Sequence, residues 1–139
     1  MRKSYMLDTN ICSYVIRRSP ESVISRLQEE VMSGANIVIS LFTYMELMYG
    51  AVSPKTPKNV LHGIDEFVAE IDEIVSAEAA VIQRGAEIQR ELMKIGQQIG
   101  DIDSMIAAHA IMENCTLVTN NTREFARVPD LKLENWVAH

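Results

Sequence analysis

The stretch that decides the fold is SYMLDTNICSYV (residues 4–15), in which a short apolar run ends at Asp8. An apolar run of this length that stops at a polar residue predicts a buried strand. The small polar residues after Asp8 lead into an apolar-periodic stretch, which predicts a helix over residues 10–17. Asp8 is then either the N-cap of that helix or a functional carboxylate at the end of a strand. Other acids converging on the same place would favour the second role.

The next segment, residues 19–34, has the signals of a second helix. Ser19 is predicted to be its N-cap, Pro20 its first helical residue and Gly34 its stop. The apolar residues at helical spacing predict a buried stripe of Val23, Ile24, Leu27 and Val31. A strand followed by two helices therefore opens the chain.

Strands and helices alternate through the rest of the sequence. The patterns predict strands over 36–42 and 116–119, an edge strand over 131–136, helices over 43–52, 59–75, 77–95 and 103–114, and a helical turn over 121–126. The run over 36–42 is continuously apolar, which is typical of a central strand covered on both faces. We therefore expect an α/β fold: a mainly parallel central sheet, flanked by helices on both faces, in a single domain over residues 1–139.

Composition narrows the class of protein. The length of 139 residues suits one globular domain, and the net charge of −6 argues against a protein that wraps nucleic acid by summed positive charge. Cys12 and Cys115 lie in apolar surroundings without metal-ligand spacing, so we expect reduced core thiols. The sequence shows no signal peptide and no apolar run near the roughly 18 residues that a spanning helix requires. We expect a cytoplasmic protein that does not enter a membrane.

Polar residues follow the predicted strands at one edge of the sheet. Asp8 follows the first strand, Glu46 lies just beyond the second, Asp103 opens the helix before the third, and Asn121 comes after it. Each has a structural alternative: Glu46 in a capping box with Thr43, Asp103 as an N-cap or a first-turn acid, Asn121 as a turn residue. Clustered carboxylates repel unless a cation neutralises them. The cluster therefore predicts a hard, oxygen-ligated metal such as Mg²⁺ or Mn²⁺.

Other chemistries find little support in the sequence. His62, His109 and His139 are scattered and lack zinc-site spacing, and His109 reads as a core or interface histidine. Ser40 and Ser104 lack the motif of a nucleophilic serine, and no glycine-rich phosphate loop is present. Of the chemistries considered, only that of a bound divalent metal ion fits the sequence.

The chain resembles the PIN-domain ribonucleases, and more closely the VapC toxins of bacterial toxin–antitoxin pairs. The motifs that carry this resemblance are MLDTNICSY, TYMELMYGA, IGDIDSMIAAHA and LVTNNTREFARVPDLKLENW, and together they span nearly the full length. The last of them is the most specific. The resemblance implies a PIN-like fold and metal-dependent ribonuclease activity.

The resemblance also assigns roles to individual residues. It implies that Asp8, Glu46 and Asp103 are metal-binding acids with catalytic roles. It places Asn121 at the fourth metal position and the hydroxyls of Thr9 and Thr119 near the site. Asp101 stands where the motif varies and is interpreted as a supporting or incidental acid. The wider family usually has Asp at the fourth position. The neutral Asn121 leaves the number of tightly held ions open.

The resemblance implies an Mg²⁺- or Mn²⁺-dependent endoribonuclease that cleaves a structured RNA, with a tRNA anticodon loop as the best candidate, and so blocks translation. Its expected partners are a VapB-like antitoxin and a second copy of the chain in a homodimer. We expect the antitoxin tail to enter the acidic pocket with an Arg in place of the cation, and to use apolar surface on the helix containing YMELMYG (residues 44–50).

Two alternatives also place acids at strand ends around Mg²⁺. One is a phosphatase of the haloacid-dehalogenase kind, which would need D-x-D where this chain has DTN. The other is a receiver-like regulatory module, which would need paired acids after the first strand and a Lys after a late one. Cleavage of RNA would separate both from a ribonuclease.

Overall fold

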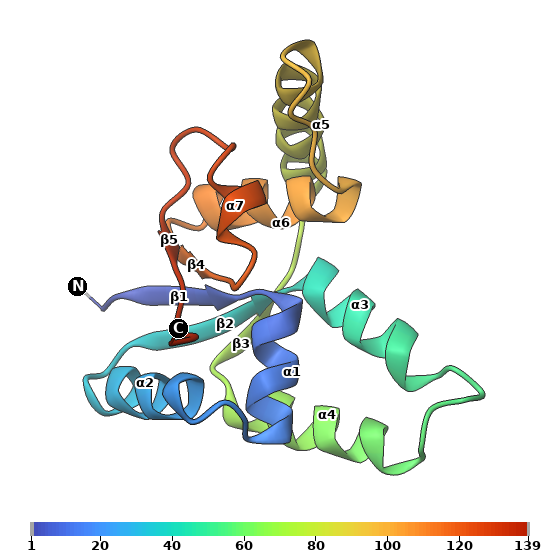
Figure 1. Cartoon of the computed structure of the whole chain (residues 1–139), viewed down its shortest axis with the longest axis vertical. Helices are drawn as coiled ribbons and strands as arrows, with labels where there is room; N and C mark the ends of the chain where they lie inside the picture. Colours follow the sequence, from blue (N-terminus) through green and yellow to red (C-terminus); the bar gives the residue numbers. More distant parts are fainter. Residues whose placement is uncertain (1, 139) are drawn as a thin grey trace.

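A computed structural model describes residues 2–138 of the chain. It contains one five-stranded sheet in which every neighbouring pair is parallel, in the order β3-β2-β1-β4-β5 (Figure 1). The strands are β1 (Ser4–Leu7), β2 (Asn36–Ser40), β3 (Glu73–Val75), β4 (Thr116–Val118) and β5 (Leu133–Glu134). The helices are α1 (Thr9–Arg17), α2 (Glu21–Met32), α3 (Leu41–Ala51), α4 (Asn59–Glu70), α5 (Ala79–Lys94), α6 (Asp101–Met112) and α7 (Thr122–Phe125). The predicted α/β class, with a parallel sheet between helices, is confirmed.

Alternate residues of the central strands point into two separate cores. Met6 of β1 packs with the core under α5, α6 and α7, whereas its neighbours Tyr5 and Leu7 pack with the core under α1, α2, α3 and α4. In β2 the same alternation places Val38 on one side and Ile39 on the other. Both faces of these strands are buried, which explains why their sequences are continuously apolar.

The order of the strands defines where a site can form. From β1 the chain builds β2 and β3 outward on one side, then returns to place β4 on the other side of β1. Ligand sites in open parallel sheets lie at the carboxyl ends of the strands, at this point of reversal. Here it lies between the ends of β1 and β4, directly beside Asp8. The order also differs from the 2-1-3-4-5 order of receiver-like folds.

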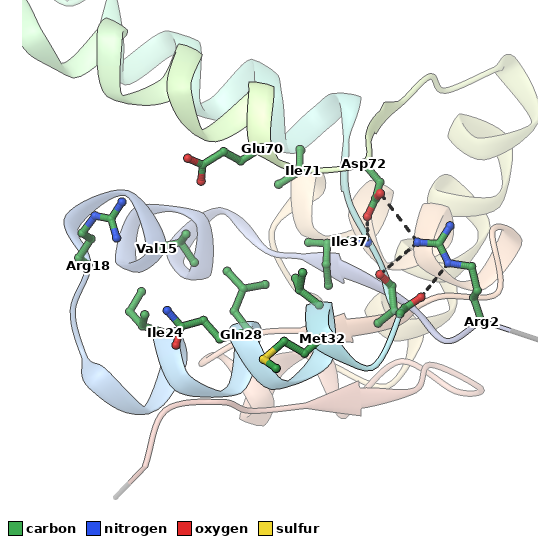
Figure 2. A pocket seen from close by; sticks show the side chains of 14 residues that line it. Arg2, Val15, Arg18, Ile24, Gln28, Met32, Ile37, Glu70, Ile71 and Asp72 are labelled. Atoms are coloured by element: carbon green, nitrogen blue, oxygen red, sulfur yellow. Dashed lines mark hydrogen bonds and ion pairs between the residues drawn. The ribbon is translucent and has the colours of Figure 1, made fainter.

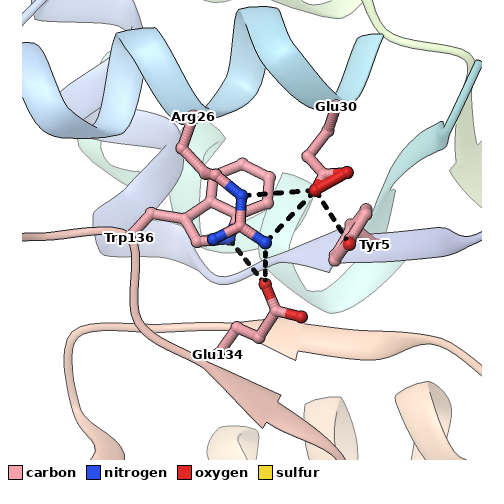
Figure 3. A network of polar contacts seen from close by, with 5 residues as sticks. All are labelled: Tyr5, Arg26, Glu30, Glu134 and Trp136. Atoms are coloured by element: carbon pink, nitrogen blue, oxygen red, sulfur yellow. Dashed lines mark hydrogen bonds and ion pairs between the residues drawn. The ribbon is translucent and has the colours of Figure 1, made fainter. Parts of the chain in front are cut away.

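A network of ion pairs and hydrogen bonds connects Glu134 and Trp136 to Tyr5 of β1 and to α2 (Figure 3). Arg26 pairs with Glu134 at 2.8 Å and with Glu30 at 3.2 Å, and Glu30 accepts a hydrogen bond from the Tyr5 hydroxyl. The Trp136 indole donates to Glu134, and its ring meets the Tyr5 ring edge-on at 5.3 Å. The short edge strand β5 is therefore held by side chains as well as by its ladder.

The second helix differs from its prediction at both ends. Ser19 does not cap α2, because Pro20 occupies the N-cap position and no side chain bonds to the first free N–H groups. The Ser19 N–H instead donates to the carbonyl of Tyr14 at the end of α1. α2 begins at Glu21, one residue after Pro20, and Gly34 follows its end with a positive φ of 86°, as a stop residue does. Val31, predicted to be buried, is 54% exposed because it lies in the wall of an open groove.

Three strands also differ from the prediction. The segment predicted as a strand over 36–42 ends at Ser40, and its last two residues already belong to α3. β3 was not predicted, because the helical periodicity of residues 59–75 appeared to continue through it. The edge strand predicted over 131–136 is real but covers only Leu133–Glu134. The predicted core thiols are confirmed, since Cys12 and Cys115 are free and buried.

Candidate active site

Asp8 lies at the centre of the candidate site and is almost fully buried, with 5% of its surface exposed. One carboxylate oxygen accepts the backbone N–H of Thr9 at 2.7 Å, and the other accepts the Thr119 hydroxyl at 2.8 Å. Burial raises the pKa of Asp8, these two hydrogen bonds oppose the rise, and the charge of Glu46 adds to it. Asp8 therefore serves as the N-cap of α1 and also faces other acids.

Glu46 is brought to Asp8 through Thr9. The Thr9 hydroxyl donates to the Glu46 carboxylate at 2.5 Å, which joins the start of α1 to the second turn of α3. The capping-box alternative for Glu46 is wrong, because Ser40 is the N-cap of α3 and its hydroxyl accepts from the Phe42 N–H. Thr43 lies inside the helix, fully buried. Glu46 is thus free of any capping role.

Asp103 lies in the first turn of α6, and the negative charges of the other acids act on its carboxyl group. Its pKa is raised to about 6, first by burial and then by the charges of Asp8, Glu46 and Glu124. Its carboxylate also lies against Gly100, where a Cβ would come within 3.2 Å of an Asp103 oxygen. The structure therefore gathers the three predicted acids within electrostatic reach of each other, despite their separation in sequence.

Glu124 is a fourth acid of the cluster that the sequence reasoning missed. The Asn121 side-chain amide donates to the Glu124 carboxylate at 3.1 Å, and the Asn121 backbone N–H donates to the Thr119 hydroxyl at 2.9 Å. Asn121 occupies the N-cap position of α7 without capping it through its side chain. The spacing of three residues from Asn121 to Glu124 across a helical turn was the available signal.

Asp101 belongs to a different contact. It is exposed, and one of its oxygens accepts from the Gln89 amide of α5 at 3.0 Å. It contributes nothing to the raised pKa of Asp103, only two residues away. The interpretation of Asp101 as incidental to the acid cluster agrees with this geometry.

The donor set fits Mg²⁺ or Mn²⁺ better than zinc. Every candidate ligand offers oxygen, while His62 is exposed beside Glu66 and His109 is buried away from the acids. Within residues 2–138, no three His, Cys, Asp or Glu side chains already form a cage for a metal ion. Mg²⁺ keeps several of its waters and binds through one or two carboxylates, so this open arrangement suits it.

Two grooves flank the sheet at its opposite ends. One, of about 640 Å³, has Thr9 and Glu46 in its wall and continues between α1, α3 and α4 past Arg17 and His62. The other, of about 600 Å³, lies at the amino ends of the strands, where Ile24, Met32 and other apolar side chains of α2 face Ile71 (Figure 2). Only the first adjoins the acids.

The comparison with known families agrees with the fold. The sequence model of the PIN domain family matches residues 5–131 of this chain. The class of the molecule is therefore that of a PIN domain.

Individual relatives narrow this class. The tRNA(fMet)-specific endonuclease VapC of Shigella flexneri is 41% identical over 132 residues, covering 95% of this chain and 97% of that protein. Ribonuclease VapC2 of Rickettsia felis is 42% identical, with the same coverage. A solved structure of VapBC2 from Rickettsia felis, bound to promoter DNA, contains a chain that matches with a TM-score of 0.86 at 40% identity, covering 96% of this chain and 99% of that one. The chain belongs to the VapC ribonucleases of the PIN-domain family. The two alternatives considered from the sequence, a phosphatase and a receiver-like module, are therefore wrong.

Among residues 2–138, no helix is long and apolar enough to cross a membrane.

Proposed function

We propose that the protein is a divalent-metal-dependent endoribonuclease and the toxin of a toxin–antitoxin pair. The observation that carries the proposal is the convergence of Asp8, Glu46, Asp103 and Glu124 at the point of reversal of the sheet. Burial, and then the charges of the other three acids, raise the pKa of Asp103 there. Carboxylates held together at such a cost in repulsion favour a bound cation.

The proposal assigns roles to the three acids expected from the sequence and to the two hydroxyls beside them. Asp8 and Asp103 hold the ion, and Glu46 holds it or orients the attacking water. Thr119 and Thr9 fix the Asp8 and Glu46 carboxylates through the hydrogen bonds described above. The bound ion supplies polarisation of the scissile phosphate and a lower pKa for a coordinated water.

The RNA backbone needs positive charge close to these acids. Arg17 lines the groove that adjoins Glu46, is itself exposed, and lies over the Tyr14 ring at 5.2 Å. A basic side chain held at this rim compensates locally for the net charge of −6. We propose tRNA as the substrate class, because a relative at 41% identity is named for its action on tRNA(fMet).

Mapping of RNA ends tests this function. The purified protein with Mg²⁺ should cut a tRNA(fMet) transcript within the anticodon loop and leave 3′-hydroxyl and 5′-phosphate ends, because water rather than the ribose 2′-hydroxyl attacks. An elongator methionine tRNA serves as the control for specificity. Cyclic phosphate ends, or no cleavage of any tRNA, would contradict the proposal.

We also propose that a VapB-like antitoxin controls the enzyme, since similar structures are of VapBC complexes. Its tail would offer an Arg to the acid cluster. For its apolar part, α3 is the proposed docking site, because this helix carries Glu46 together with the exposed side chains of Leu41 and Tyr49. The groove beside α2 in Figure 2 lies at the other end of the sheet from the acids. Growth should stop when the chain is expressed alone in the cytoplasm and resume with the antitoxin. The expected homodimer stays a prediction.

Asn121→Asp should tune metal binding. The substitution adds a negative charge at nearly the same shape, and it places that charge against Glu124, to which Asn121 now donates. We expect tighter Mn²⁺ binding by calorimetry and a lower melting temperature without metal, because like charges repel until a cation neutralises them.

The matched control is Asn120→Asp. Asn120 uses its side-chain oxygen to accept from Asn135, a role that a carboxylate keeps, so its substitution adds the same charge beside the cluster without touching Glu124. Equal effects of the two substitutions, or none from either, would show that Asn121 plays no part in the metal site.

A further inference from the structure

His109 is a buried titratable residue for which the ribonuclease mechanism has no use so far. It lies in α6, six residues after Asp103, and is fully buried. Its Nε2 lies 3.1 Å from the carbonyl oxygen of Ser76, and its Nδ1 lies 2.7 Å from the Ser40 hydroxyl. The Phe42 ring packs edge-on against it. Both ring nitrogens are thus bound to elements other than its own helix.

The partners of His109 determine its protons. A carbonyl oxygen can only accept, so Nε2 must carry the hydrogen that bonds to Ser76. In the neutral ring Nδ1 is then an acceptor, and the Ser40 hydroxyl donates to it. The same hydroxyl oxygen accepts the Phe42 N–H at 3.1 Å. Every group is satisfied with a neutral ring, and burial lowers the pKa of His109 in agreement.

This arrangement joins the two helices that carry the acids. Ser40 ends β2 and is the N-cap of α3, which holds Glu46, whereas His109 lies in the helix that holds Asp103. Each acid is six residues from the bridge, about 9 Å along its helix axis. A tilt of about 6° between the helices would therefore move a carboxylate by about 1 Å, and displacements of that size can cost about 100-fold in rate.

We propose that His109 is a positioning residue: by bonding Ser40 it sets the separation of Glu46 and Asp103, and through it the affinity of the cluster for a divalent ion. The inference rests on the proposed metal-dependent function. It assigns to His109 no contact with the substrate or the ion.

Two substitutions separate the bridge from simple packing. His109→Asn keeps an oxygen near the position of Nδ1, able to accept from Ser40, but loses the donor to Ser76. His109→Gln keeps an N–H near the position of Nε2 but loses the acceptor for Ser40. Both lose the ring that packs on Phe42. Their effects on stability should therefore be similar, while their effects on the acid cluster should differ.

The measurements are Mn²⁺ affinity by calorimetry, kcat and KM for RNA cleavage, and the melting temperature. We expect His109→Gln to weaken Mn²⁺ binding and to lower kcat by about tenfold each, with KM unchanged, a loss at the low end of what is typical for groups that orient metal ligands. His109→Asn should stay within about threefold of the wild type, because it keeps the bond to Ser40. Equal losses in both variants, or a lower melting temperature with unchanged Mn²⁺ affinity, would overturn the proposal.

Ser40→Ala keeps the test decisive if a His109 variant does not fold. It should weaken Mn²⁺ binding as His109→Gln does, and it also removes the cap of the Phe42 N–H. Where His109→Gln folds, the double substitution should bind Mn²⁺ no more weakly than the weaker-binding single variant, because both single substitutions break the Ser40–His109 bond. Additive losses would contradict the bridge. A wild-type protein that binds Mn²⁺ without cleaving RNA would refute the proposed function and leave the affinity test intact, whereas no Mn²⁺ binding at all would refute both.

Discussion

Asp8→Asn should reduce RNA cleavage to the background of the assay and leave the fold intact. The substitution removes one negative charge from the cluster, while the amide oxygen can still accept the Thr9 N–H that Asp8 now accepts at 2.7 Å. The amide nitrogen would meet Thr119, whose hydroxyl can accept as well as donate. Loss of activity would thus follow from lost charge rather than lost structure.

The same substitution should stabilise the protein when metal is absent, or leave its stability unchanged. Burial and the charge of Glu46 already raise the pKa of Asp8, so its ionised form is unfavourable in the folded state. A neutral amide removes that penalty, and each kcal/mol relieved would raise the melting temperature by about 3 °C in a domain of this size. Thermal unfolding in EDTA, followed by circular dichroism, measures the change.

Asp101→Asn is the control for this experiment. It makes the same chemical change in the same region of the fold, at an exposed residue whose oxygen bonds Gln89 rather than the cluster. Cleavage should persist in this variant. If Asp8→Asn folds normally and still cuts RNA, Asp8 has no role in the reaction.

The sequence predicted the convergence of Asp8, Glu46 and Asp103 because a general rule connects strand ends to one edge of a parallel sheet. No comparable rule places a side chain that projects from a short turn. Glu124 lies in the four-residue helix α7, and its approach to Asp103 depends on how that turn is packed after β4. The three-residue spacing from Asn121 showed only that these two side chains could meet, so the place of Glu124 in the acid cluster became visible only in three dimensions.

Errors in the elements have a similar cause. β3 has only three residues and its apolar positions continue the helical spacing before it, so pairing with β2 decides its structure rather than its own pattern. The capping box at Thr43 failed because Leu41 and Phe42 fit a strand equally well, which displaced the predicted start of α3 by two residues. Short apolar segments are settled by tertiary contacts.

Removal of metal should abolish cleavage, and added Mg²⁺ or Mn²⁺ should restore it. The proton should compete with the ion at Asp103, whose pKa is raised to about 6. Cleavage should therefore decline as the pH falls through about 6, because a protonated carboxyl is a poor ligand. Activity in EDTA, or full activity well below that pH, would contradict a metal held by Asp103.

The stability of the metal-free protein should show the opposite trend with pH. The pKa of Asp103 rises from 3.8, its ordinary value, to about 6 on folding, so between these values the folded state holds a proton that the unfolded chain has lost. Stability is then greatest below this window and falls as the pH rises through it. Mn²⁺ binds the charged form and should add about 1.4 kcal/mol at tenfold excess over its Kd, which offsets part of the loss near pH 7. In Asp103→Asn this part of the pH dependence should vanish, and the stability that Mn²⁺ adds should be smaller. Melting curves that match those of the wild type at every pH, with and without Mn²⁺, would place Asp103 outside the site.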